Sequence, residues 1–264
     1  MAVRDIPFTP DQIGTGRVRF PSGAPIPTIT DMAVDPYVNT RIPKETLVEG
    51  IQFWPQVKGI YPGVVLLHDS WGLNNQIKDL GNRLACEGFT VLVPNLYNRL
   101  GGMVTANADV AEALSERLNE PLAMQDINSC CEYLNTRDYV KRNLHAVIGF
   151  GLGGTLATRF ACQRKRLRAA VSFHGRIVPA MGEFPQLYSP LLYHRAEQDA
   201  SVTADDVEQL RQAALSHKKI VEILLYADAK AGFCDDTRKD RFHAGHAQTA
   251  WDATVQFLTT HLQA

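Results

Sequence analysis

The sequence predicts an α/β protein built on one mostly parallel sheet of seven to eight strands, with helices on both faces. Two observations predict this class. Short apolar runs alternate with segments whose apolar residues have helical spacing, which is typical of strand–helix–strand units. The run GVVLLHD, from Gly63 to Asp69, is apolar almost throughout, as expected for a strand covered on both faces.

The first 45 residues predict no regular element. Seven prolines fall there, and neither helical nor strand periodicity survives at that density. We expect residues 1–45 to form an irregular arm on the surface and residues 46–264 to form a single α/β domain. Apolar residues of the arm, such as Ile26 and Tyr37, offer a contact for a possible homodimer.

The alternating elements follow in chain order. Strands are expected at residues 47–54, 63–69, 89–94, 145–150, 168–173, 190–195 and 220–226. Helices are expected near residues 75–88, 106–118, 122–134, from 154 onward, 204–217 and at the carboxyl end of the chain. In the first helix Ile77, Leu80 and Leu84 have helical spacing. Asn74 or Asn75 can cap its start, and Gly88 can end it.

Charge and cysteine content exclude several classes of protein. The 27 basic and 28 acidic residues nearly cancel, which disfavours a nucleic-acid binder or a basic membrane-surface protein. No apolar run is long enough to cross a membrane, and the first residues lack the apolar core of a signal peptide. The five cysteines include no CxxC pair, so we expect reduced thiols and a cytoplasmic location.

The most informative turn is GFGLGG, residues 149–154, which follows a predicted strand. Its glycine spacing fits a dinucleotide fingerprint, but that motif opens the first strand–helix unit and needs an acid about twenty residues on. The strand that follows reads VSFHG and ends on no acid. The alternative is a nucleophile elbow with position 151 at its centre, where the Leu152 N–H would help bind an oxyanion.

Several motifs together resemble the dienelactone hydrolase family over about residues 47–260. They match the family in order and spacing: HDSWGLN (68–74), PNLYNR (94–99), GFGLGG (149–154), HRAEQDASV (194–202), LLYADAKAGFCDD (224–236) and a carboxyl-terminal AWxxTxxFL (250–258). The resemblance implies an α/β-hydrolase fold and cleavage of lactones and small esters by a Cys-His-Asp or Ser-His-Asp triad, without a cofactor.

The chain departs from that family at two of its three catalytic positions. The resemblance places the nucleophile at Gly151 and the histidine at Ala231, and neither residue can perform that chemistry. The acid remains as Asp199, which alone is not a triad. Without a nucleophile, glycine at 151 relieves the strain of an elbow residue with positive φ.

A binding pocket is expected to survive. The predicted pocket residues are Asp69, Ser70, Trp71, Arg99 and Leu152, together with the three triad positions. Asp69 stands where the family has a glutamate that holds the resting thiol. Arg99 matches an arginine that binds the substrate carboxylate, although a salt bridge to a nearby acid is an equal alternative.

Other groups could in principle replace the triad. Cys234 lies on the loop of Ala231 and could pair with His243 or His246, but the simpler interpretation is a loop thiol near surface histidines. His68, Ser172, His174 and His194 are interpreted as structural. No histidines have metal-ligand spacing with a carboxylate, so no metal site is expected.

Two functions follow from these residues. The favoured one is a dienelactone hydrolase-like protein that no longer runs the triad reaction and binds a small ligand, with or without a carboxylate, or a partner. The alternative is an active ester or lactone hydrolase that uses a displaced nucleophile, or water activated by Asp69 or Asp199. Sequence alone also allows that the replacements at Gly151 and Ala231 are engineered.

Overall fold

The computed structural model describes residues 6–23, 47–177 and 181–262. Eight strands form one sheet in the order β1-β2-β4-β3-β5-β6-β7-β8. Their bounds are Ile13–Pro21 (β1), Leu47–Pro55 (β2), Tyr61–Leu67 (β3), Thr90–Pro94 (β4), Val140–Phe150 (β5), Ala169–Phe173 (β6), Leu191–Ala196 (β7) and Val221–Tyr226 (β8). The pairs β1–β2 and β2–β4 are antiparallel and all others are parallel, which confirms the predicted fold class.

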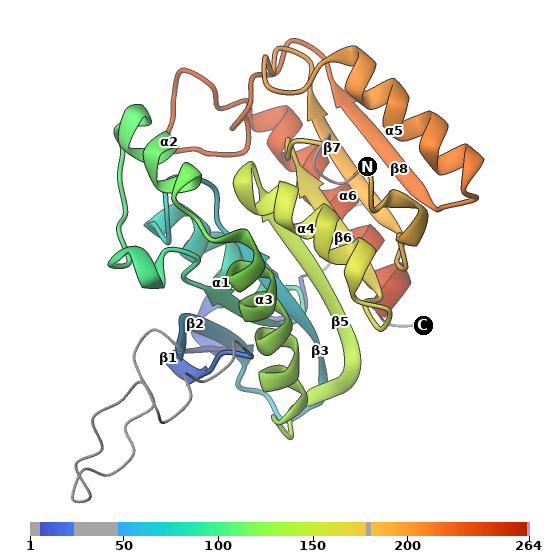
Figure 1. Ribbon diagram of the computed structural model, residues 1–264. Coiled ribbons are helices and arrows are strands. Elements are labelled where there is room, and N and C mark those ends of the chain that lie inside the picture. Colours follow the sequence, from blue (N-terminus) through green and yellow to red (C-terminus); the bar gives the residue numbers. More distant parts are fainter. Residues whose placement is uncertain (1–5, 24–46, 178–180, 263–264) are drawn as a thin grey trace, which may run out of the picture.

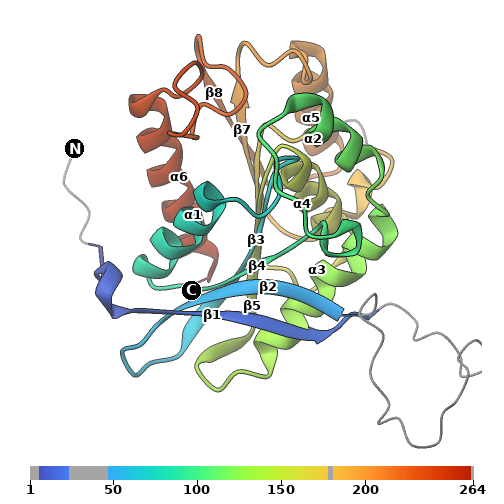
Figure 2. The same cartoon turned by 90° about the vertical axis from the view of Figure 1, so that its left-hand side faces the viewer.

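Helices cover both faces of the sheet. Their bounds are Asn75–Cys86 (α1), Ala108–Glu116 (α2), Glu120–Asn135 (α3), Leu152–Gln163 (α4), Ala204–Ser216 (α5) and Ala244–Leu262 (α6), with short 3-10 turns at Pro10–Gln12, Asn98–Leu100 and Phe184–Gln186. Helices α1 and α6 lie on one side of the sheet, and α3, α4 and α5 lie on the other (Figures 1 and 2).

The two helical layers account for the apolar strand pattern. In β3, the four residues from Val64 to Leu67 are fully buried. Val65 and Leu67 pack in the core beneath α3 and α4, whereas Val64 and Leu66 pack beneath α1 and α6. A strand with alternate side chains in two cores reads as a continuous apolar run.

Helix α1 begins as its sequence predicts. The Asn74 side chain accepts the Ile77 N–H at 3.0 Å, which caps the first turn. Its buried face includes Ile77, Leu80 and Leu84. The helix is followed by Gly88 at φ +91°, a conformation that glycine adopts at little cost. None of the helices in the described residues is long and apolar enough to span a bilayer.

The expectation of an irregular arm over residues 1–45 is wrong for part of that range. Residues Ile13–Pro21 form β1, which pairs along its whole length with β2. Its phenylalanine, Phe20, is buried and stacks on Tyr133 of α3. Residues 24–46, including Ile26 and Tyr37, lie outside the described residues, and with them the contact expected for a homodimer.

Candidate functional site

A cleft of about 460 Å³ opens at the carboxyl ends of the parallel strands. This is the edge of an α/β sheet at which ligands generally bind. The loop after β3, the turn between β5 and α4, the end of β6 and the loop after β8 all contribute to it. Six of the predicted site residues line the cleft: Asp69, Ser70, Trp71, Gly151, Leu152 and Ala231.

The turn from β5 into α4 has the geometry of a nucleophile elbow. Gly151 lies between strand and helix at φ +49° and ψ −111°, so the predicted positive φ is confirmed. A Cβ at Gly149 would lie 2.0 Å from the carbonyl oxygen of Gly153. The turn therefore requires a residue without a side chain at 149, as the elbow motif does.

The Asp69 carboxylate fills the space in which an elbow side chain would stand. A Cβ added to Gly151 would lie 2.1 Å from Asp69 Oδ1 and 2.5 Å from Oδ2. Asp69 Oδ1 accepts the N–H of Leu152 at 3.0 Å and that of Ser70 at 2.6 Å. These donors, from the residue after the elbow and from the β3–α1 loop, make up an oxyanion hole in this fold. The protein's own carboxylate occupies it.

Asp199, the predicted triad acid, is buried, and only one of its two carboxylate oxygens is hydrogen-bonded among the described residues. It follows β7, and only 7% of its surface is exposed. Oδ1 accepts hydrogen bonds from the Ser201 N–H at 2.9 Å and from the Ser201 hydroxyl at 2.7 Å. Oδ2 is buried and has no hydrogen-bond partner among the described residues. Asp199 is not among the residues that line the cleft, contrary to our expectation, and Ser201 stands there instead.

His174, which the sequence predicts to be structural, lines the cleft. It directly follows β6 and has a φ of +44°, an uncommon conformation for a residue with a side chain. The Gly232 N–H, next to Ala231, donates to its Nε2 at 3.3 Å. The signal in the sequence was its position at the carboxyl end of a parallel strand.

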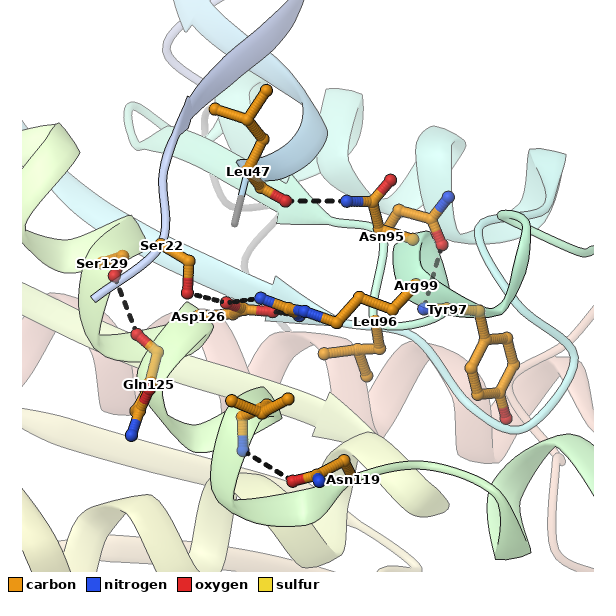
Figure 3. Close-up of polar contacts among 12 residues, drawn as sticks. Ser22, Leu47, Asn95, Leu96, Tyr97, Arg99, Asn119, Gln125, Asp126 and Ser129 are labelled. Carbon is orange, nitrogen blue, oxygen red and sulfur yellow. Dashed lines mark hydrogen bonds and ion pairs between the residues drawn. The ribbon is translucent and has the colours of Figure 1, made fainter. Parts of the chain in front are cut away.

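Arg99, predicted as a substrate-binding residue, is not among the residues that line the cleft. Its guanidinium instead makes a two-pronged ion pair with Asp126 of α3, as Figure 3 shows. The Ser22 hydroxyl donates to Asp126 Oδ1 at 2.5 Å from the far side. The alternative interpretation, a salt bridge to a nearby acid, is confirmed. Through Arg99 and Ser22, Asp126 joins the turn after β4 and the end of β1 to α3.

Three other arginines replace Arg99 as cations of the cleft: Arg176, Arg238 and Arg241. The Arg238 guanidinium lies 4.3 Å from the ring centroid of Trp71, within cation–π distance. Arg241 donates to the carbonyl oxygen of Ala231 at 3.3 Å. The cleft also contains acidic side chains, among them Glu116 and Asp235. Loop arginines have no periodic signal, so sequence reasoning missed them.

The alternative of a thiol–histidine pair at Cys234 finds no support among the described residues. His246 hydrogen-bonds to the Ala227 carbonyl through Nε2 at 2.9 Å and stacks on His243. Burial raises the pKa of the Cys234 thiol far above its usual value. A protonated thiol is a poor nucleophile.

The buried histidines serve the fold. His68 accepts the Leu96 N–H at 3.0 Å, and its other ring nitrogen lies 2.7 Å from the Asp69 carbonyl oxygen. Burial lowers the pKa of His68 to about 4, so its ring stays neutral. His194 hydrogen-bonds to Tyr226 and Thr254, and burial lowers its pKa to about 3. The described residues include no cluster of ligands suited to a metal ion.

The strand order, the elbow and the cleft define an α/β-hydrolase fold. The model of the dienelactone hydrolase family matches residues 48–262, so the chain belongs to that family. The chain is 27% identical over 217 residues to a Yersinia pestis protein named "Putative carboxymethylenebutenolidase", covering 78% of this chain and 80% of that one. It is 26% identical over 218 residues to a Bradyrhizobium protein named "Probable 2-oxo-3-(5-oxofuran-2-ylidene)propanoate lactonase", covering 79% and 87%.

Solved structures give the same fold. The crystal structure of a "Putative Dienelactone Hydrolase" from Klebsiella pneumoniae superposes with a TM-score of 0.80 at 22% identity, covering 94% of this chain and 98% of that one. At that identity the likeness concerns the fold alone.

Proposed function

We propose that this family member does not run the triad reaction and instead binds a small carboxylated ligand, or a lactone, in the cleft. One observation carries the proposal: the Asp69 carboxylate occupies the space of an elbow side chain at Gly151 and takes both oxyanion donors. Acyl transfer at the elbow needs that space for a nucleophile and those donors for the substrate oxygen.

The surroundings of the missing histidine support the same proposal. A triad acid orients and stabilises an imidazolium ion, and Ala231 offers no ring. The buried Oδ2 of Asp199 accordingly has no partner among the described residues. The arginines of the cleft supply charge for a ligand carboxylate, and a planar guanidinium fits a carboxylate well.

Hydrolysis of an activated aryl ester tests the loss of triad chemistry. Gly151→Cys together with Ala231→His should raise the rate above that of the unchanged chain, and either change alone should do little, because triad groups act as a unit. The pair is also made with Asp69→Ala, which clears the space that the new thiol needs. An unchanged chain as fast as the restored variants would overturn the proposal.

Binding is measured separately, by calorimetry with propionate and with a simple butenolide. Arg238→Gln and Arg241→Gln should weaken propionate binding, whereas Arg211→Gln, an exposed arginine of α5, should not. If neither compound binds the unchanged chain at millimolar concentrations, the ligand class is wrong.

A further inference from the structure

The two oxygens of the Asp69 carboxylate have different surroundings. Oδ1 accepts the backbone N–H groups of Ser70 and Leu152. Oδ2 accepts no hydrogen bond from the described residues, and the side chain lines the cleft. A carboxylate held through one oxygen is fixed in position, and the lone pairs of the other oxygen remain available to a reactant.

The position of this carboxylate is that of a nucleophile. Both its oxygens and its Cγ lie within 2.5 Å of the point where a Cβ at Gly151 would stand. Only glycine at 151 leaves that space to the side chain of Asp69. Carboxylates are established nucleophiles in covalent catalysis.

We propose that Asp69 is a covalent nucleophile toward saturated carbon, and that the substrate class is a small halogenated carboxylate. This proposal goes beyond the proposed function. The two have one premise in common, which is that the cleft binds a small molecule with a carboxylate group. The placement of the two N–H donors indicates whether Asp69 attacks a carbonyl carbon or a saturated carbon. Attack on a carbonyl would need them for the substrate oxygen, but they are bound to Asp69 itself. Displacement at saturated carbon forms no oxyanion, so it has no need of them.

The same donors suit the second half of such a reaction. Once Oδ2 carries an alkyl group, Asp69 is an ester, and water must attack its Cγ. The negative charge then develops on Oδ1, which already lies 2.6 Å and 3.0 Å from the two N–H groups. Donors at that distance from a developing oxyanion are what catalysis of ester hydrolysis requires.

The reaction balances without an oxidant or a reductant. A lone pair of Oδ2 forms the bond to carbon as the carbon–halogen bond breaks, and the halide leaves with the bonding pair. Water then adds to Cγ, the Cγ–Oδ2 bond breaks, and the alcohol departs with the original Oδ2 and one proton of that water, while the other proton passes to solvent. The net change converts an alkyl halide and water into an alcohol, a halide ion and one proton released to solvent.

Three arginines offer contacts for a substrate that carries a carboxylate. Arg176, Arg238 and Arg241 line the same cleft as Asp69, beside the acidic Glu116, Glu120 and Asp235. They can hold the carboxylate of the substrate and offset the charge of the departing halide. Arg238 is in addition stacked on Trp71, which limits the positions that it can take.

Chloroacetate is the probe, used with the full chain carrying Cys234→Ala. The other four cysteines are buried, so this change removes the most accessible thiol from alkylation. We expect chloride release, a carboxymethyl ester on the Asp69 peptide, or both, depending on which half-reaction is slower. Asp69→Asn and Asp69→Ala should each lower chloride release at least about 10³-fold. Asp109→Asn, at an exposed acid of α2, is the matched control and should change nothing.

Propionate binding separates the two proposals. If propionate binds but chloroacetate gives neither chloride nor an ester beyond the level of Asp69→Asn, the nucleophile is overturned and the binding function stands. If chloroacetate reacts at Asp69 although propionate does not bind, the nucleophile stands and the proposed ligand class falls. If neither occurs, both are overturned.

Discussion

Two carboxylates, Asp69 after β3 and Asp126 in α3, differ in what their oxygens contact. Asp126 is 4% exposed, and Arg99 and Ser22 bind both its oxygens. Asp69 is half-buried and lines the cleft; its Oδ1 accepts two backbone N–H groups, and its Oδ2 accepts no hydrogen bond from the described residues. The hydrogen-bonded oxygens of Asp126 stabilise the fold, whereas the second oxygen of Asp69 keeps its lone pairs available to a reactant.

The largest effect on stability is expected at the paired carboxylate. Asp126→Ala removes the carboxylate that forms an ion pair with the mostly buried Arg99 guanidinium. We expect a loss of about 3 kcal/mol in the free energy of unfolding, measured by urea denaturation. Chloride release from chloroacetate, measured on the folded protein, should stay within about twofold of the unchanged chain. A loss below about 1 kcal/mol would show that Asp126 is not the structural carboxylate of the pair.

The next effect tests the steric link between Gly151 and Asp69. Gly151→Ala places a Cβ against the Asp69 carboxylate at a backbone φ of +49°. We expect a loss of about 2 kcal/mol in unfolding free energy, together with loss of chloride release as Asp69 leaves its two donors. Gly182→Ala, where an added Cβ meets nothing within 4 Å, is the control. Equal stability of the two variants would contradict the link.

A smaller effect concerns a buried group outside the cleft. Neither ring nitrogen of His145 has a hydrogen-bond partner among the described residues, and burial lowers its pKa to about 4. We expect His145→Leu to raise the free energy of unfolding at pH 7 by about 1 kcal/mol, because an unpaired polar group leaves the core.

The pH dependence of that variant follows from the same shift. Between about pH 4 and 6.5 the unfolded chain binds a proton at His145 that the folded chain does not, so acidification destabilises the fold. His145→Leu should therefore reduce the slope of unfolding free energy against pH by up to about 1.4 kcal/mol per pH unit. His217→Gln, at an exposed histidine, should leave the slope unchanged. An unaltered slope in His145→Leu would contradict this account.

The smallest effect on stability is expected at the reactive carboxylate. In Asp69→Asn the amide oxygen can still accept the N–H groups of Ser70 and Leu152, so the unfolding free energy should change by less than about 1 kcal/mol. Urea denaturation beside Asp126→Ala measures the difference. A loss as large as that of Asp126→Ala would make Asp69 a structural residue and remove the contrast between the two.

The sequence predicted most of the sheet because β3 to β7 carry buried apolar runs that two helical layers demand. It missed β1, whose segment IGTGRVRFP has few apolar residues, two glycines and prolines on both sides. Only its pairing with β2 makes it a strand. Local propensity could not supply a partner distant in the chain.

The backbone of the site was predictable where a sequence motif determines its conformation. The contacts of individual side chains were not predictable. The turn at Gly151 followed from glycine spacing. The choice of Arg99 between a ligand and an acid depended on Asp126, which lies 27 residues further along the chain. The place of the Asp69 carboxylate depended on the space that Gly151 leaves open, which becomes visible only when both residues are placed.

A single turnover of chloroacetate in oxygen-18 water tests most directly whether Asp69 has taken the place of the elbow nucleophile. The protein is in excess, and mass spectrometry follows the glycolate product and the peptides of Asp69 and Asp126. The account predicts that glycolate leaves with an unlabelled hydroxyl oxygen and that the label enters Asp69 but not Asp126. Glycolate labelled at its hydroxyl, with an unlabelled Asp69 peptide, would mean that water attacks the carbon directly and would contradict the account.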